Sequence, residues 1–128
     1  MNQEITDHKL NGLNNALKIT KTVPGPSGAS TKYDIVGTAG LIPGFGPRTF
    51  GVNLRFQEGP IKVEEDMNGI TNEALLAVVI DRLRGFQSGP FACRENALAL
   101  TKLEEGLMWL QKRTRERIAR GVEGTLEK

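Results

Sequence analysis

The most informative segment for the fold is PFACRENALALTKLEEGLMWLQKRTRERIARG, which occupies residues 90–121 of this 128-residue chain. Its leucines recur with the 3, 4, 3 spacing of an apolar seam along one α-helix, and they are Leu100, Leu103, Leu107 and Leu110. Proline is tolerated in a first helical turn and glycine ends helices, so we predict a helix from Pro90 or Phe91 to about Arg120, ended by Gly121. Gly106 interrupts it with a poor helix former, which would permit another backbone to come close.

A shorter helix is predicted just before this one. Thr71 suits the N-cap, and Glu73 follows in the first turn. Apolar residues then recur at helical spacing, and they are Leu75, Leu76, Val79, Ile80 and Leu83. Gly85 is placed to end the helix, and residues 86–91 form a connector. The two helices therefore predict a helical hairpin over residues 71–121.

The first half of the chain has the alternating pattern of strands. Residues 14–23, 31–36 and 49–56 alternate apolar and polar side chains, and the last of these is the clearest strand. A Pro-Gly cluster at 24–28 and a glycine-rich loop at 37–47 separate them. Residues 61–63 are expected to extend the last strand before an acidic loop.

These elements predict an α+β fold, in which a short N-terminal antiparallel sheet is followed by a helical hairpin with a long C-terminal helix. Three strands and two helices bury little surface for the apolar residues present, so we expect self-association, most simply a dimer through the long helices. We expect one domain over residues 1–128, with a loose N-terminus at 1–12, a β-rich part at 13–63 and the hairpin at 71–121.

Composition limits the classes of protein. Hydrophobic residues make up 38% and charged residues 25% of the chain, as in soluble globular proteins. No apolar run approaches the roughly 20 residues that a membrane span needs. The N-terminus lacks the basic and apolar segments of a signal peptide, and the single cysteine, Cys93, indicates a reducing compartment. We therefore expect a cytoplasmic protein that does not enter a membrane.

The residues that catalysis requires are scarce. His8 is the only histidine and lies in the loose segment, and one histidine with Cys93 cannot make a usual zinc site. Cys93 itself is expected to be a small packed side chain. The loop at 37–47 leads into a strand, so it does not cradle phosphate as a glycine-rich loop before a helix does. The sequence therefore predicts no enzyme, no metal and no cofactor.

Basic residues gather at the end of the long helix. Residues 112–120 hold five basic residues and one acidic residue, a local balance of +4 in a chain whose net charge is +2. Arg113, Arg117 and Arg120 share one helix face, and Arg94 lies near the opposite end. Spacing alone favours a solvated basic helix end, where arginine meets the helix dipole, over an anion site. Antiparallel pairing of two long helices would bring both ends together and favour a site.

Aromatic and amide side chains lie at the start of the long helix. Phe86 and Phe91 flank it and could stack on a nucleotide base, while Asn96 could hydrogen-bond the polar edge of a base or ribose. Together with arginines that bind phosphate, these are the components of a nucleotide site.

Two segments resemble a known family. Residues 85–105, GFQSGPFACRENALALTKLEE, and residues 108–114, MWLQKRT, are similar to phage anti-defence sponge proteins, which bind a signalling nucleotide and keep it from its receptor. The resemblance covers about residues 70–125. A strand-rich part before these helices makes the chain most similar to the Thoeris anti-defence family of the first type. The anti-CBASS sponge family shares the helical signature but is smaller and all-helical, so the predicted sheet argues against it.

The resemblance implies a function and partners. Family members bind cyclic ADP-ribose isomers and sequester them without cleavage, so that the effector awaiting the signal in the infected bacterial cell stays inactive. Some members also bind cyclic di- or trinucleotides at a second site, and they assemble as dimers or hexamers. The resemblance thus implies a protein without catalytic activity that acts in the host cytoplasm.

The resemblance also implies site residues. Phe86 would stack on the adenine, Asn96 would hydrogen-bond the ligand, and Arg113 would hold phosphate. Arg94 and Arg117 are further candidates, for the second site. From the β-rich part, Arg55 and Lys62 are candidates to complete the pocket, and the loop at 37–47 would cover the ligand.

Three other functions stay open at this point. A small nucleic-acid-binding phage protein would use the basic helix end on phosphates, with strong salt dependence and an affinity that grows with polymer length. An enzyme that degrades the signal would need a base or nucleophile that the sequence does not offer. A phage structural or assembly protein would bind no nucleotide.

Overall fold

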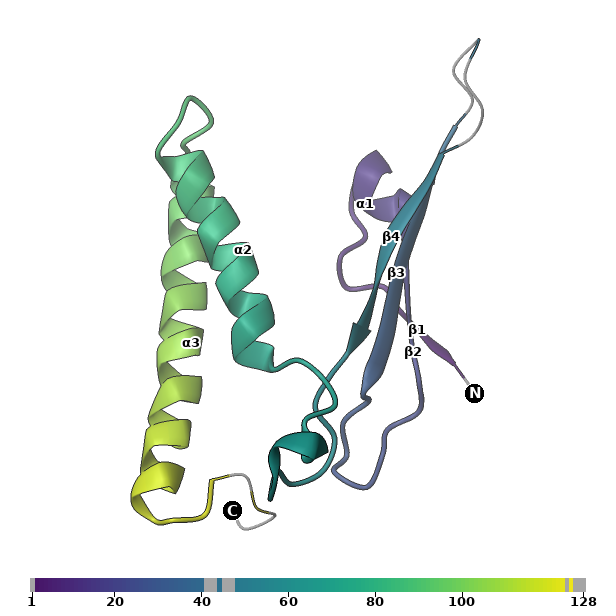
Figure 1. Ribbon diagram of the computed structural model, residues 1–128. Coiled ribbons are helices and arrows are strands. Elements are labelled where there is room, and N and C mark those ends of the chain that lie inside the picture. The colour runs from purple at the N-terminus through teal and green to yellow at the C-terminus, as the bar shows by residue number, and fades with distance from the viewer. Residues whose placement is uncertain (1, 41–43, 45–47, 124, 126–128) are drawn as a thin grey trace. The chain divides into compact units, whose positions relative to one another are not determined.

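The computed structural model describes residues 2–40, 44, 48–123 and 125 (Figure 1). The chain divides into two compact units, which we call the sheet unit, Met1–Phe56, and the hairpin unit, Gln57–Lys128. Each unit is described by itself. The expected α+β architecture, an antiparallel sheet followed by two helices, is confirmed. One domain over residues 1–128 stays a prediction.

The sheet unit is a four-stranded antiparallel sheet in the order β1-β2-β3-β4. Its strands are β1 (Gln3–Ile5), β2 (Leu17–Lys21), β3 (Lys32–Ala39) and β4 (Arg48–Arg55). The three predicted strands are present. The fourth, β1, lies in the segment expected to be loose and pairs Ile5 with Ile19 of β2. A short helix, α1 (Gly12–Ala16), takes the place of the first residues of the predicted strand at 14–23.

The strand β3 continues through Gly37 to Ala39, so the prediction that a loop begins at residue 37 is wrong. Gly37 is a packing residue there, because a Cβ would meet the side chains of Phe50 at 2.7 Å and Leu17 at 2.8 Å. The remainder of that loop, apart from Gly40 and Gly44, lies outside the described residues, and so does its predicted role in covering a ligand.

His8 is half-buried in the sheet unit, which corrects the expectation that its segment is loose. Its Nε2 lies 2.6 Å from the carbonyl oxygen of Leu17, and because a carbonyl only accepts, the ring nitrogen donates. This hydrogen bond fastens the segment between β1 and α1 to the start of β2. His8 therefore has a structural contact that the sequence did not reveal.

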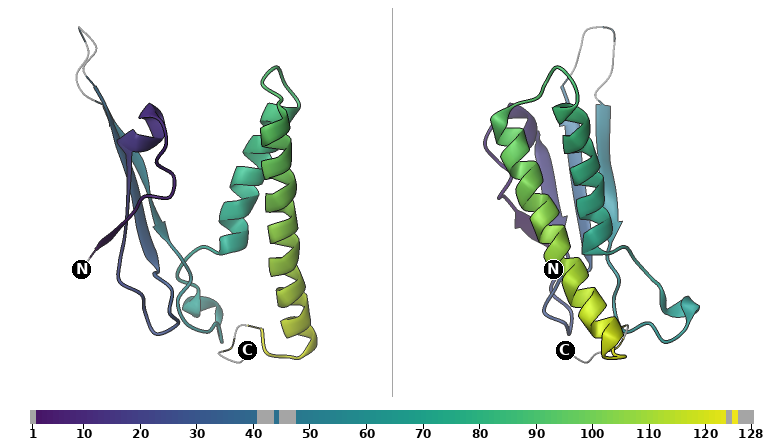
Figure 2. Two further views of the ribbon diagram at one scale, coloured as in Figure 1. Left: turned by 180° about the vertical axis from the view of Figure 1, so that it is seen from behind. Right: turned by 90° about the vertical axis from the view of Figure 1, so that its left-hand side faces the viewer.

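The hairpin unit contains a short 3-10 helix, η1 (Glu64–Asp66), and the two long helices α2 (Asn72–Gln87) and α3 (Arg94–Ala119). Figure 2 shows α2 and α3 side by side in both views. The N-cap at Thr71 is confirmed, since its Oγ1 accepts a hydrogen bond from the Ala74 N–H at 3.0 Å. The end of α3 at Gly121 is also confirmed, because Gly121 has a φ of +73° that favours glycine.

Two helix boundaries differ from the prediction. Gly85 does not end α2, which continues to Gln87 and is capped by Ser88. The helix α3 begins at Arg94 and not at residue 90 or 91, because Cys93 is extended and its Sγ caps the Asn96 N–H at 3.5 Å. Cys93 is therefore the exposed N-cap of α3, not a packed residue of its first turn.

The leucines of the predicted seam on α3 are partly buried in the hairpin unit. Leu100, Leu103, Leu107 and Leu110 are half-buried, and the helix that contacts α3 is α2. Ile80 of α2 is only 2% exposed. Arg84 of α2 also pairs with Glu104 of α3 at 2.7 Å. Large apolar side chains remain exposed outside the seam, among them Leu98, Met108 and Trp109.

The segment 57–70 does not extend the sheet as predicted for residues 61–63. The backbone N–H groups of Lys62 and Val63 donate to Asp66 Oδ2 at 2.9 and 3.3 Å, so they are not used in a strand ladder. Gln57 and Asn68 hold the ends of this segment together. The Gln57 side chain accepts a hydrogen bond from the Asn68 N–H and donates to the Asp66 carbonyl, and the Asn68 side chain accepts from the Glu58 N–H. Within the described ranges, no helix is both long and apolar enough to cross a membrane.

Candidate functional site

The turn between α2 and α3 is held by side chains at both of its ends. Gln87 Oε1 accepts a hydrogen bond from the Cys93 N–H at 3.0 Å, and Ser88 Oγ donates to the Gly85 carbonyl at 2.9 Å. The Cys93 cap then starts α3. The turn therefore sets the spacing between the last turn of α2 and the first turn of α3.

Three predicted site residues lie at this end of the hairpin. Phe86 is half-buried in the last turn of α2, and Asn96 is half-buried in the first turn of α3. Arg94, the first residue of α3, is exposed. Over the described part of the chain, neither the Asn96 amide nor the Arg94 guanidinium has a hydrogen bond or ion pair. An aromatic ring on the last turn of α2 and an amide and a cation on the first turn of α3 thus lie at the same end of the hairpin.

Arg82 is a fourth residue at this end, and it was not among the predicted site residues. Its Cζ lies 5.0 Å from the centroid of the Phe86 ring, within the range of a cation–π contact. The two residues are four positions apart on α2, a spacing that places side chains on one helix face. This i, i+4 pairing of arginine with phenylalanine was the available signal.

Arg113 lies at the other end of α3. It is 17 residues from Asn96, which corresponds to about 25 Å along a helix. Arg113 is exposed, and no described residue forms an ion pair with it. Its neighbour Lys112 is bonded to Glu116, and this hydrogen bond and the lysine charge lower the pKa of the Glu116 carboxyl. Within one copy, Arg113 is too far from Asn96 for both to touch one nucleotide.

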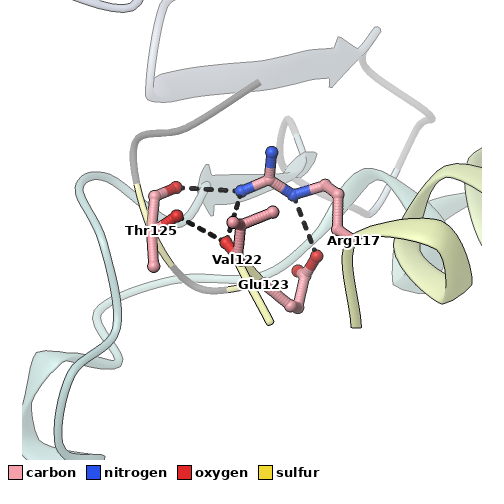
Figure 3. A network of polar contacts seen from close by, with 4 residues as sticks. All are labelled: Arg117, Val122, Glu123 and Thr125. Atoms are coloured by element: carbon pink, nitrogen blue, oxygen red, sulfur yellow. Dashed lines mark hydrogen bonds and ion pairs between the residues drawn. The ribbon is translucent and has the colours of Figure 1, made fainter. Parts of the chain in front are cut away.

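Arg117 differs from Arg113 in that its side chain is engaged by the protein (Figure 3). The residue is 5% exposed. Its Nε donates to Glu123 Oε2 at 3.1 Å, and its Nη2 donates to the carbonyls of Val122 at 2.9 Å and Thr125 at 3.0 Å. Arg117 therefore holds the turn that follows α3 in this structure, and its role in ligand binding stays a prediction.

The two candidates expected from the β-rich part lie in different units. Arg55 is the exposed last residue of β4 in the sheet unit, and Lys62 is exposed before η1 in the hairpin unit. Neither has an ion pair to another described side chain. That they complete a ligand pocket stays a prediction.

A depression on the surface of the sheet unit is lined by none of the predicted site residues. This shallow depression of about 270 Å³ is lined by Val36, Thr49, Phe50, Gly51, Val52 and Asn53. Among the described residues, no group of three or more histidine, cysteine, aspartate or glutamate side chains is placed to hold a metal ion.

Comparisons with known proteins match the helical part and extend beyond it. The family model described as Acb2/Tad1, hairpin domain, matches residues 52–115, which include all of α2 and most of α3. The chain is 50% identical to a protein of Bacillus phage SBSphiJ7 named Thoeris anti-defense 1, over 104 residues that cover 81% of this chain. The match spans 66% of the length of that relative. The chain therefore belongs to the Acb2/Tad1 family and is related to its Thoeris anti-defence members.

Proposed function

We propose that this protein is a phage anti-defence sponge, which binds cyclic ADP-ribose-type signals and sequesters them without cleavage in the infected bacterial cell. The observation that carries the proposal is the end of the hairpin that holds Phe86 and Asn96, where the Asn96 side-chain amide has no hydrogen bond to a described residue. The kinship to a protein named for Thoeris anti-defence supports the choice of signal.

The chemistry of these side chains fits a nucleotide made of a base, ribose and phosphates. The half-buried Phe86 ring offers an aromatic face for adenine, and the Asn96 amide can both donate and accept a hydrogen bond. Arginine binds phosphate with two parallel hydrogen bonds. Binding without cleavage requires no nucleophile or base, and in our proposal the site residues only bind the ligand.

Two copies of the chain would complete this site. Asn96 and Arg113 are centred on position 104.5, close to the middle of α3. If two α3 helices cross antiparallel near that position, Asn96 of one copy approaches Arg113 of the other, and each dimer holds two such sites. Gly106 lies near the crossing point and has no atom within 4 Å of where its Cβ would be. Trp109, 58% exposed, would be covered by the second helix.

A second site for cyclic di- or trinucleotides, with Arg94 and Arg117, is part of the proposal. At Arg117 a phosphate would have to compete with the Glu123 carboxylate for the guanidinium. Arg94 has no such competitor among the described side chains. We therefore propose Arg94 as the principal cation of this second site, in dimers or hexamers of the chain.

The test is calorimetric titration of the purified protein with cyclic ADP-ribose isomers and with cyclic di- and trinucleotides. We expect tight saturable binding of one isomer that is lost in Phe86→Ala and in Arg113→Ala. Arg115→Ala is the matched control, because Arg115 is also exposed and has no ion pair with a described residue. Mass spectrometry after denaturation is expected to recover the ligand intact, and a cleaved ligand would overturn the sponge.

The competing function has its own signature in the same experiment. Arg113 and Arg115 are exposed cations without a described ion pair, and such cations also suit the phosphates of nucleic acid. If affinity for DNA or RNA grows with polymer length and falls steeply with salt, while no cyclic ADP-ribose isomer binds, the nucleic-acid function is correct.

A further inference from the structure

The face of α2 that carries Phe86 has two features that the proposed site does not explain. Arg82 lies over the Phe86 ring at 5.0 Å, and Gly85 lies between them in the sequence, inside the helix. These residues are related by i, i+3 and i+4 spacing, so they form one continuous strip of the helix surface.

Arg82 has the Phe86 ring as its described contact and no ion pair with any described residue. Its neighbours one turn away on α2 are Val78, Val79, Gly85 and Phe86, none of which is acidic. By contrast, Arg84 is two residues away and pairs with Glu104. The guanidinium of Arg82 is therefore placed by an aromatic face and is not held by a carboxylate.

Gly85 is the second feature. It does not end α2 and does not have a positive φ, so neither a helix cap nor backbone strain requires glycine there. A Cβ at this position would meet no atom within 4 Å. Alanine would therefore fit within the chain itself and would favour the helix. The exposed backbone of Gly85, next to the half-buried Phe86 ring, is instead suited to the close approach of a flat molecule.

We infer that Arg82, Gly85 and Phe86 form the base-binding strip of the site, with the planar base held between the Phe86 ring and the Arg82 guanidinium, beside Gly85. The inference rests on the proposed function. A guanidinium stacks on flat rings as readily as it binds phosphate, and Arg82 is exposed and can lift from Phe86 to admit the base. Arg82 and Gly85 are thus ligand-contacting residues that recognise the aromatic base and not the phosphates.

The test uses the full-length protein and the cyclic ADP-ribose isomer that the wild type binds. Arg82→Ala is expected to weaken binding about three- to thirtyfold, the range that corresponds to a cation–π contact. Because the contact is with the base, this factor is expected to be similar at low and high salt, whereas the effect of Arg113→Ala shrinks with salt. Arg84→Ala is the matched control and is expected to bind as the wild type does.

Gly85→Ala separates binding from folding. We expect it to raise the midpoint of thermal unfolding while weakening binding, two changes that a purely structural glycine would not show together. A double-mutant cycle of Arg82→Ala and Phe86→Ala is expected to be non-additive, because both act on one base.

The outcomes distinguish the inference from the function on which it rests. If Arg82→Ala and Gly85→Ala bind the cyclic ADP-ribose isomer as tightly as the wild type does, the base-binding strip is wrong and the proposed function is retained. If Arg82→Ala loses affinity only at low salt, Arg82 acts on phosphate and the inference is overturned. If the wild type binds no cyclic ADP-ribose isomer, the proposed function fails and the strip fails with it.

Discussion

The two ends of α3 are both rich in polar side chains but use them in opposite ways. At the end next to the turn, Asn96 and Arg94 have no described side-chain partner, and the turn is held by Gln87 and Cys93 instead. At the other end Arg117 is buried and satisfied by Glu123, Val122 and Thr125. A basic helix end is therefore not by itself a binding site, because one of its arginines, Arg117, is bonded to the chain that follows the helix.

The largest effect is expected from the middle of the hairpin, which keeps the two ends at a fixed separation. Ile80→Ala removes a side chain that is 2% exposed and is expected to destabilise the fold by about 2–4 kcal/mol. Val78→Ala on the same helix changes an exposed side chain and is the control. Urea unfolding measures both, and equal losses would show that the hairpin does not depend on its core.

The next effect tests the contrast between Arg117 and Arg113 directly. Arg117→Ala removes the hydrogen bonds that Arg117 donates to the Glu123 carboxylate and to the carbonyls of Val122 and Thr125, and we expect a loss of about 1–3 kcal/mol. Arg113→Ala, one turn away and exposed, is expected to change stability by less than about 0.5 kcal/mol. Thermal unfolding of both variants measures the difference. If the two variants lose equal stability, Arg117 is no more structural than Arg113.

A smaller effect, with opposite signs in two measurements, is expected at Gly106. Gly106→Ala adds a methyl group where the described chain leaves open space, so it is expected to stabilise the single chain by about 0.5–1 kcal/mol. If a second α3 crosses there, the same methyl group weakens the dimer. Unfolding at low protein concentration and sedimentation velocity at high concentration measure the two effects. An unchanged dimer would show that the helices do not cross at Gly106. Asn96 of one copy would then not approach Arg113 of the other.

The smallest effect is expected at the ion pair of Lys112 and Glu116. The hydrogen bond from Lys112 lowers the pKa of Glu116 in the folded protein, so its contribution to stability is present above the unfolded pKa and is lost as the pH falls through the folded value. Glu116→Gln is therefore expected to lower the free energy of unfolding slightly at neutral pH and to leave it unchanged in acid. Thermal unfolding of the wild type and the variant at neutral and at acidic pH measures the difference. An equal effect at the two pH values would assign Glu116 another role.

Much of the fold was predictable because it rests on local patterns. Alternation located β2, β3 and β4, and helical spacing located α2 and α3. The errors came from residues whose meaning depends on distant contacts. Gly37 resembles a turn residue, but Phe50 and Leu17 pack over it.

For the candidate site, residue types were predictable and their partners were not. An aromatic ring, an amide and arginines near the ends of one helix could be read from spacing. That Arg82 lies over Phe86, and that Arg117 is bonded to the chain after α3, depends on rotamers and on how the C-terminal turn folds. No local pattern specifies these.

Sequence patterns were sufficient to locate three of the four strands, the two long helices, the cap at Thr71, the stop at Gly121 and the family resemblance, because propensity, periodicity and motif are properties of neighbouring residues. Which polar side chains have no partner among the described residues could be seen only in the folded chain. Whether an arginine is free to bind a ligand depends on the carboxylates and carbonyls that folding brings within hydrogen-bonding distance, and these are set by packing between segments that are separate in the sequence.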